Sequence, residues 1–499
     1  MRDAVSANPH KETRLWWFPS VEVLIFIIVF LLSLLVMPNL VNSDGDLGRH
    51  ITVGEVLLDT HTILRQDIFS HTMLGEDLIL HEWLSDVIFA LIHRAAGLNG
   101  IAWMTAIVIA SATVLLVAGL KFLKVRTFTR LLAGFAAFAA GTIHWHTRPH
   151  IFTTFIFTGF VLALIYFYQT QRWKVLLPLP FVMILWANLH GAFVSGLVLV
   201  GLFLIGLLLE KRFPAALQMG ILLVVLILAS WINPYGPKML THSFGYLRLD
   251  YLVDFTDEYN SPNFHDAISW PFAGLILLSF VMGWRSKRFL GWTPLVAISF
   301  WTASALYSAR NIPLYGQLTV TFLACEADQM VAALSPRLDA YLTRTDTIGR
   351  RAWGWMWAAL FAGLLIWLEA SGGYIDYAGL GNNFNPSYFP VEAIDTLEES
   401  GLPEGNMFNE FGWGGYLLLR LWPERLVFID GQTDFYGEDL TRLHEQTINA
   451  QGDWQSVLDN YQVQWVILPP NRGLGPWLDQ SSEWKLSYRD DTASVWVRR

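Results

Sequence analysis

Eleven apolar runs of helix length constrain the fold of this chain more than any other feature of its sequence. A helix of about 20 mostly apolar residues spans the hydrocarbon core of a bilayer. Only 15% of the residues are charged, against about a quarter in soluble domains, and the mean hydropathy is +0.39. We therefore predict an α-helical polytopic membrane protein with about 11 transmembrane helices. The runs lie near 21–41, 99–120, 129–145, 151–168, 174–188, 192–209, 215–232, 270–284, 290–308, 313–333 and 352–371.

Lys and Arg residues predict how these helices cross the membrane, because cytoplasmic loops hold the excess of basic residues. If the N-terminus is cytoplasmic, eighteen Lys and Arg residues fall in inner segments and seven in the outer loops before residue 372. The first apolar run has no small-residue cleavage site after it, so we expect a retained helix and not a signal peptide. We predict a multi-pass protein of the plasma (inner) membrane with a cytoplasmic N-terminus. The odd number of spans then puts the C-terminal region outside.

The sequence divides into a transmembrane domain at 1–372 and a soluble α/β domain at 373–499, which we predict to be extracytoplasmic. The first outer loop, 42–99, carries apolar residues at helical spacing over Leu80–Ala96, as an amphipathic helix on a membrane surface would. The second large outer loop, 233–269, is acidic. In the C-terminal domain we expect strands at Arg425–Ile429, Val463–Leu468 and Ala493–Val497, and helices at 390–400 and 438–461.

Charge and cysteine content exclude other classes of protein. The net charge of -9 offers no basic surface of the kind that nucleic acid demands, so we expect no nucleic-acid partner. The only cysteine, Cys325, allows no intramolecular disulfide and no cysteine-based zinc site. Membrane lipid is the partner that this composition predicts.

Polar side chains collect at the predicted outer ends of the spans. Eleven of the thirteen histidines fall on that side. Ionisable and amide groups are costly at membrane depth, so a convergent set of them indicates a polar cavity. For any single residue, anchoring of a loop at the interface is the alternative. The candidate substrate-binding residues are Arg49, His50, His71, Glu82, Arg148, His150, Asn188, His190, Asn233, Tyr235 and Arg310.

The residues best suited to catalysis follow the first apolar run, where Asp44 and Asp46 flank Gly45. A flexible turn at this point presents two carboxylates at the boundary between water and lipid. Such a pair suits a general base, or it suits a divalent cation, which prefers hard oxygen ligands. The alternative is a structural turn, because Asp and Gly are common turn residues. Asp44 and Asp46 are the candidate catalytic residues.

Arg148 is the candidate phosphate ligand, because a guanidinium binds phosphate oxygens bidentately and Pro149 stiffens its position. The alternative is an interfacial arginine that extends into water. Arg310 is the second candidate. Histidines can donate hydrogen bonds or ligate a metal, but Pro149 keeps His146 and His150 off one helix face. We expect hydrogen bonding by these histidines rather than metal binding.

Taken together, these features resemble the C-type glycosyltransferase superfamily (GT-C), polytopic enzymes that take sugars from polyprenyl-phosphate carriers. The shared features are an acidic motif in the first outer loop, an amphipathic outer helix, polar groups at the outer ends of many spans and a soluble C-terminal domain. The resemblance implies that Asp44 or Asp46 is the catalytic acidic residue. By location, Arg148 and Arg310 resemble the basic residues that contact the carrier phosphate. The C-terminal domain shows no sequon-reading motif of the oligosaccharyltransferase kind.

The resemblance implies a membrane glycosyltransferase that moves a sugar from a polyprenyl-phosphate carrier to a glycan, lipid or protein acceptor on the extracytoplasmic face. A transporter or flippase for a polar, anionic or lipid-linked solute is the alternative, and it requires polar groups through the full depth of the membrane. A third interpretation is a scaffolding protein of the cell envelope.

Polar residues of the C-terminal domain either form turns and caps or cover the cavity and select the acceptor; they are Asn409, Gly414, Gly415, Tyr416, Asp430, Gln432, Asp434 and Tyr436.

Overall fold

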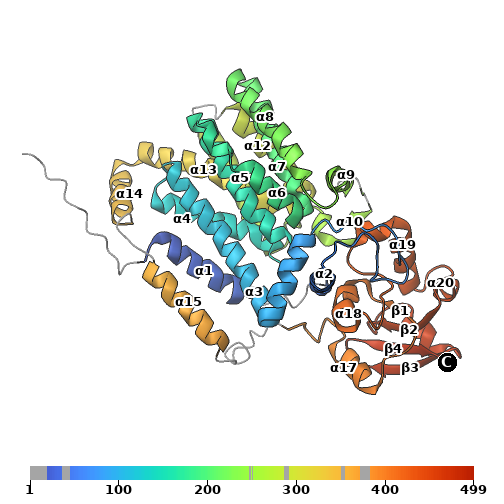
Figure 1. The fold of residues 1–499 in the computed structure, drawn as a ribbon. Helices are drawn as coiled ribbons and strands as arrows, with labels where there is room; N and C mark the ends of the chain where they lie inside the picture. The colour runs from blue at the N-terminus through green and yellow to red at the C-terminus, as the bar shows by residue number, and fades with distance from the viewer. Residues whose placement is uncertain are drawn as a thin grey trace, which may run out of the picture.

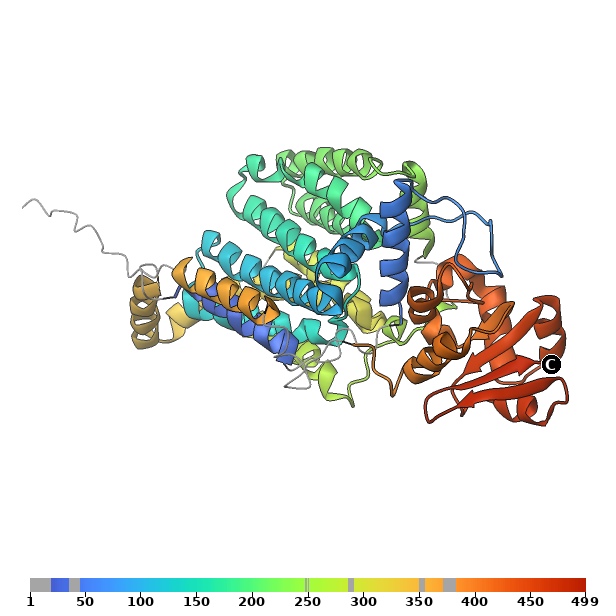
Figure 2. The same cartoon turned by 60° about the horizontal axis from the view of Figure 1, so that its bottom comes forward.

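The computed structural model describes residues 19–35, 45–246, 249, 251–285, 291–349, 355–370 and 383–499. Its two parts are a bundle of helices and a C-terminal α/β domain, which lie side by side (Figure 1). A second view shows the same division (Figure 2). Of the two candidate catalytic residues, Asp46 lies within the described residues and Asp44 lies outside them.

The helices of the bundle carry the predicted spans. They are α1 (Val21–Leu35), α3 (Trp83–Phe122), α4 (Thr127–Gly141), α5 (His150–Thr170), α6 (Leu179–Leu189), α7 (Val194–Leu209), α8 (Phe213–Ser230), α11 (Trp270–Arg285), α12 (Trp292–Tyr307), α13 (Ile312–Leu334) and α15 (Trp355–Ala370). Five helical segments within the described residues are long and apolar enough to cross a membrane: α3, α5, α8, Gly191–Leu209 and Ala267–Trp284. Each of the eleven apolar runs coincides with one of these helices, but the number of membrane crossings stays a prediction.

The outside of the bundle is apolar. Large side chains remain exposed on it, such as Phe181 at 75%, Leu217 at 66% and Phe280 at 77%. Soluble proteins rarely expose apolar surface on this scale, whereas hydrocarbon covers it at no cost. The surface therefore fits a multi-pass membrane protein.

Shorter helices connect the spans. At the end of the bundle next to the C-terminal domain they are α2 (Leu47–Thr60), η1 (Thr142–His144), η3 (Gly191–Phe193), α9 (Pro237–Tyr246), α10 (Leu252–Phe255), η4 (Asp257–Tyr259), η5 (Ala267–Ser269) and η6 (Ala309–Asn311). The remaining two are η2 (Trp173–Leu176) and α14 (Pro336–Gly349).

Two helices of the first outer loop position the site. The predicted amphipathic helix is the first part of α3, which is kinked at Ala96 and Gly97, where the backbone leaves helical geometry. Gly97 has a φ of 59°, which a glycine adopts without the steric cost that a Cβ brings. The sequence pattern did not reveal α2. This helix packs against α3 at Gly54, where an added Cβ would lie 2.0 Å from the carbonyl oxygen of Asp86. The two helices therefore touch backbone to backbone.

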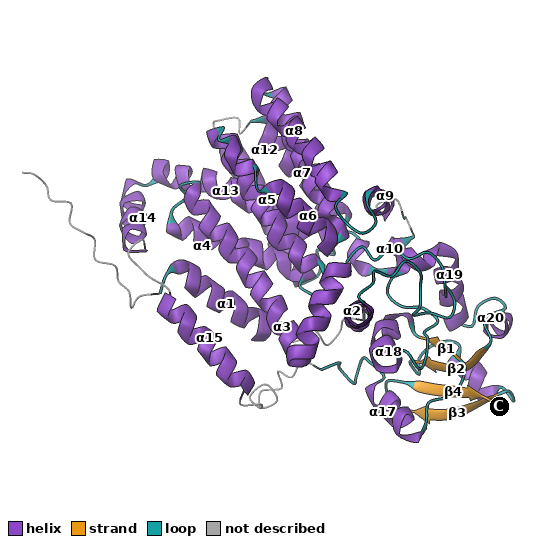
Figure 3. Ribbon diagram, viewed as in Figure 1, coloured by secondary structure: helices purple, strands orange, loops and turns teal. Residues whose placement is uncertain are grey.

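The C-terminal domain is built on one sheet, which contains all the strands of the described residues (Figure 3). Its elements are α17 (Val391–Ser400), β1 (Asn406–Asn409), η7 (Phe411–Trp413), α18 (Gly414–Leu421), α19 (Thr433–Ile448), α20 (Trp454–Asn460), β2 (Val463–Leu468), α21 (Gly475–Gln480), β3 (Trp484–Arg489) and β4 (Ser494–Arg498). The strand order is β1-β2-β4-β3. Strands β1 and β2 are parallel, and the other two pairs are antiparallel.

One strand prediction in this domain is wrong. Arg425–Ile429 does not join the sheet, and Val427 instead forms an isolated parallel bridge with Ser70 of the first outer loop. The run is apolar because Val427, Phe428 and Ile429 are fully buried where the domain meets the loop. The helix predicted at 390–400 is confirmed as α17, and the pattern at 438–461 belongs to two helices, α19 and α20, with a turn between them.

One of the apolar clusters continues from the bundle into the C-terminal domain. It includes Phe157 of α5, Leu47 of α2 and Leu417 of α18. Helices α2 and α18 approach so closely that a Cβ on Gly48 would lie 2.2 Å from the carbonyl oxygen of Gly415. The first outer loop is thus packed between the bundle and the C-terminal domain.

Candidate active site

A polar cavity of about 360 Å³ lies where the bundle, α2 and the C-terminal domain meet. Its size falls within the range of small-molecule sites, which begins at about 300 Å³. Eight of the residues predicted from the sequence line it: Asp46, Arg49, His50, Glu82, Arg148, His150, His190 and Arg310. Gln432 and Asp434, which the sequence singled out in the C-terminal domain, line it as well. The chief lining residues that the sequence did not predict are His81, Glu258, Tyr259 and Tyr388.

Asp46 and Arg148 form an ion pair in this cavity. Asp46 precedes the first turn of α2, and its Oδ2 lies 2.9 Å from Nη1 of Arg148, which stands just before α5. The two side chains are 23% and 28% exposed, so both remain accessible. On its other side Asp46 touches the C-terminal domain, because a Cβ on Gly431 would lie 1.6 Å from Asp46 Oδ1. A carboxylate and a guanidinium therefore lie together beside open space.

Arg310 supplies a second guanidinium. Its Nη1 lies 3.5 Å from Oε1 of Glu258 and donates a hydrogen bond to the Tyr259 hydroxyl, while its guanidinium lies 5.2 Å from the centre of the Tyr259 ring. Burial tends to raise the pKa of Glu258, but the charges of Arg310 and Arg148 outweigh burial and lower that pKa. Glu258 is therefore ionised at neutral pH. His144 lies 3.4 Å from its other oxygen.

Glu82 lies among three histidines. Its Oε1 is 3.2 Å from Nε2 of His190, and its Oε2 is 3.8 Å from Nε2 of both His50 and His81. Burial raises the pKa of Glu82, because a charged carboxylate loses its hydration there. His50 is oriented by Asp86, whose Oδ1 lies 2.7 Å from His50 Nδ1. Burial tends to lower the pKa of His50, but the bond to Asp86 and its charge outweigh burial and raise that pKa.

Arg49 links α2 to the C-terminal domain. Its Nε lies 3.3 Å from Oδ2 of Asp430, and its Nη2 donates a hydrogen bond to the Gln432 side chain. Arg49 and Asp430 are buried, so removal of one partner would leave the other charge without hydration. Asp430 and Gln432 belong to the polar residues that the sequence singled out in the C-terminal domain, and here they face the first outer loop.

Four of the predicted residues do not line the cavity. The side chain of Asn188 donates to the carbonyl oxygens of Ile184 and Ile232 and accepts from the Trp83 indole. The side chain of Asn233 donates to the carbonyl oxygens of Ser230 and Gly236 and accepts from the amide of Tyr235. The Tyr235 hydroxyl donates to the carbonyl oxygen of Leu64 and accepts from the amide of Leu80. His71 forms a hydrogen bond with the carbonyl oxygen of Met407. These bonds hold loops together, so we assign the four residues to the scaffold.

No motif in the sequence indicated some of the residues that line the cavity. Glu258 and Tyr259 lie in the acidic outer loop at 233–269, which is the signal that could have pointed to them. His81 precedes Glu82 in the helix that the sequence predicted, but nothing distinguished it from the other outer histidines. Tyr388 reaches the cavity from a segment that precedes α17, far along the chain.

The arrangement suits the transfer of a group from a phosphate. A guanidinium binds phosphate oxygens through paired, charge-assisted hydrogen bonds. A nearby carboxylate repels phosphate but can accept a proton from an attacking hydroxyl. The cavity holds both kinds of group at one end of an apolar bundle.

Comparison with known proteins gives a match in structure alone. No family model matches the sequence, and no curated protein sequence matches it. An oligosaccharyltransferase of Archaeoglobus fulgidus matches the structure with a TM-score of 0.56 and 11% identity, over 89% of this chain and 68% of that one. ArnT from Cupriavidus metallidurans matches with a TM-score of 0.52 and 15% identity, over 95% of this chain and 97% of that one. Both proteins are C-type glycosyltransferases. The chain therefore has the GT-C fold, as its sequence predicts.

Proposed function

We propose that this protein is a membrane glycosyltransferase that moves a sugar from a polyprenyl-phosphate carrier to an acceptor on the extracytoplasmic face. The observation that carries the proposal is the Asp46–Arg148 pair, which opens into a polar cavity next to apolar helices. The solved structures with this fold add support, because the archaeal oligosaccharyltransferase AglB from Archaeoglobus fulgidus was determined with a dolichol-phosphate and ArnT with undecaprenyl phosphate.

In the proposed reaction, Asp46 accepts the proton of an acceptor hydroxyl. The acceptor oxygen attacks the anomeric carbon of the donor sugar on the face opposite the phosphate. The bond from that carbon to the phosphate oxygen breaks, and its electron pair leaves with the phosphate. Arg148 and Arg310 stabilise the negative charge that develops there, and the configuration of the sugar is inverted.

The pair between Asp46 and Arg148 has to open for this reaction. A partly exposed ion pair contributes at most about 1 kcal/mol. Each hydrogen bond from a guanidinium to a phosphate contributes about 1.5–3 kcal/mol, and the fork geometry provides two. Donor binding therefore outweighs the loss of the pair and releases Asp46 to act as a base. Glu258, which stays ionised, holds Arg310 in position.

The proposal is tested with the full chain in lipid nanodiscs. Native mass spectrometry measures the binding of undecaprenyl phosphate. The transfer reaction uses a polyprenyl-phosphate-sugar extract of host membranes, with loss of sugar from the carrier as the signal. We expect Asp46→Asn to keep carrier binding and to slow transfer by about 10²- to 10⁴-fold, or about 3–5 kcal/mol. We expect Arg148→Ala to weaken carrier binding about 10- to 100-fold.

Arg94→Ala is the matched control. Arg94 pairs with Glu55 and Asp59 on the exposed side of the first outer loop, and none of the three lines the cavity. Loss of an arginine at this position should change neither binding nor transfer. If the wild-type protein does not bind undecaprenyl phosphate, or if Asp46→Asn transfers sugar at the wild-type rate, the proposal is wrong.

A further inference from the structure

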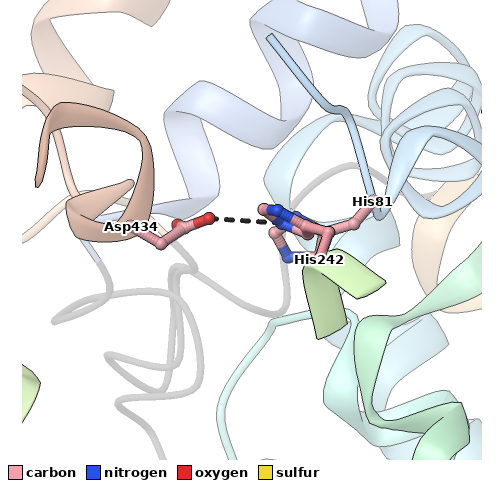
Figure 4. A group of neighbouring side chains, drawn as sticks. All are labelled: His81, His242 and Asp434. Carbon is pink, nitrogen blue, oxygen red and sulfur yellow. Dashed lines mark ion pairs between the residues drawn. The ribbon is translucent and has the colours of Figure 1, made fainter. Parts of the chain in front are cut away.

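Three potential metal ligands from distant parts of the chain converge beside the cavity (Figure 4). His81 lies just before α3, His242 lies on α9 and Asp434 lies on α19 of the C-terminal domain. One ligand atom of each lies within 4.8 Å of the others. Figure 4 shows the two imidazole rings together, with Asp434 directed at them from the opposite side. The ring centres are 5.2 Å apart.

Each of these residues has a buried polar atom that lacks a hydrogen bond. The atoms are Nδ1 of His81, Nε2 of His242 and Oδ2 of Asp434, and none has a hydrogen-bond partner in the described part of the chain. His242 Nε2 and Asp434 Oδ2 form only a loose ion pair at 3.4 Å. A buried polar group without a partner costs about 1–3 kcal/mol. Polar atoms without partners on three neighbouring residues point to a shared ligand, and a cation bound by all three residues would supply one.

The kind of side chain narrows the choice of cation. Two imidazoles and one carboxylate are typical ligands of zinc, whereas magnesium and calcium take oxygen ligands almost exclusively. Zinc binds these atoms at about 2.0–2.2 Å in a tetrahedron, which places the ligand atoms about 3.4 Å apart. Since the present atoms lie within 4.8 Å of one another, a closure of at most about 1.4 Å would bring the three ligand atoms to zinc-binding separations.

We propose that His81, His242 and Asp434 bind a zinc-type divalent cation that fastens the C-terminal domain to the outer end of the bundle. The proposal does not rest on sugar transfer, because the three residues would bind the ion whatever the cavity does. Two of the three, His81 and Asp434, also line the cavity, so the ion would lie at its edge. The ion thereby forms part of the cavity wall as well as a connection between α9 and α19.

Metal content of the full chain tests the proposal. The protein in nanodiscs is stripped with a chelator, loaded with zinc, washed and analysed by elemental mass spectrometry. We expect one zinc ion per wild-type chain. His242→Ala and Asp434→Ala should weaken zinc binding at least about tenfold, since even a residue that only supports a metal ligand has an effect of that size. His265→Ala, at an exposed histidine of the same outer loop, should bind zinc like the wild type.

Two further measurements separate metal binding from misfolding. Hydrogen exchange should slow in α9 and α19 when zinc is added to the wild type and not when it is added to Asp434→Ala. Cobalt loaded into the wild type should give the absorption bands of a tetrahedral site, and this result needs no variant. Absence of zinc from the wild type, full binding by both ligand variants, or loss of binding in His265→Ala would each overturn the proposal. None of these measurements involves a donor sugar, so the proposed function can fail independently.

Discussion

Gly415→Ala tests how tightly the C-terminal domain is docked on the first outer loop. The added Cβ would lie 2.2 Å from the carbonyl oxygen of Gly45 and 3.1 Å from the backbone nitrogen of Arg49. Both are backbone atoms and cannot rotate away. Ordinary van der Waals contact begins at 3.4 Å, so α2 and α18 would have to separate by about 1.2 Å at this point.

Two opposing effects determine how much docking free energy is lost in Gly415→Ala. Extra volume in a filled interface costs about 1–3 kcal/mol. Alanine in a helix recovers about 0.5–1 kcal/mol relative to glycine, because it loses less backbone freedom on folding. The steric cost is the larger effect, and it leaves a net loss of about 0.5–2 kcal/mol in docking free energy. This corresponds to an increase of about 2- to 30-fold in the fraction of undocked domain.

Hydrogen exchange measures that fraction directly. The amide of Val427 donates to the carbonyl of Phe69, and the amide of His71 donates to the carbonyl of Val427, so both are protected only while the domain is docked. We expect exchange in peptides that cover 66–72 and 425–429 to be about 2- to 30-fold faster in Gly415→Ala. Peptides of β2 and β4 should be unaffected, because these strands pair within the domain.

Gly412→Ala is the matched control, since a Cβ there has no atom within 4 Å. It stiffens the backbone in the same way but meets no obstacle, so exchange at 66–72 and 425–429 should stay at the wild-type rate. Equal rates in Gly415→Ala and the wild type would refute the close docking of α2 and α18.

Two further predictions concern topology and acid stability. In a Cys325→Ser background, a cysteine at Ser400 should react with an impermeant reagent in intact cells and one at Lys174 should not; the reverse result would invert the orientation. Because Glu258 has a lowered pKa in the folded state, its charge stabilises the fold above pH 4.5, and that contribution is lost as the pH falls through the lowered value. Glu258→Gln should therefore lower the melting temperature at pH 7 and have a smaller effect below pH 4, and an equal effect at both values would contradict this account.

Hydropathy was sufficient to locate the helices of the bundle, because lipid imposes apolar character on every residue that faces it. It could not reveal α2, which is buried between protein surfaces and contains Arg49, His50 and two close-packed glycines. The run at Arg425–Ile429 illustrates the opposite error. A buried segment of β-branched and aromatic residues has the sequence pattern of a strand whether a sheet or a loop packs against it. Here an outer loop packs against it.

The sequence pointed to several residues that line the cavity because they sit at the ends of spans, where a charged residue is unexpected. Asp46, Arg148 and Arg310 were found in this way. For Asp430 and Asp434 the sequence left two roles open, turn and cap chemistry or a cover for the cavity, since an Asp in a loop is ordinary and only the docked fold brings these residues to Arg49 and His242. Long-range pairing of this kind leaves no pattern in a single sequence.

The distribution of charge argues against transport through the bundle. Four of the described spans contain no Asp, Glu, Lys or Arg over 98–120, 151–171, 192–209 and 214–230, whereas α4 carries Arg130 and α13 carries Glu326 and Asp328. Charged groups gather at the cavity at one end and around Arg126 at the other, where its Nε lies 2.9 Å from Asp328 Oδ1. A transporter or flippase has to carry a polar head across the region between these ends, and unpaired charge is costly there. A transferase has to bind the phosphate at one end only, while the apolar chain of the carrier stays in lipid beside uncharged helices.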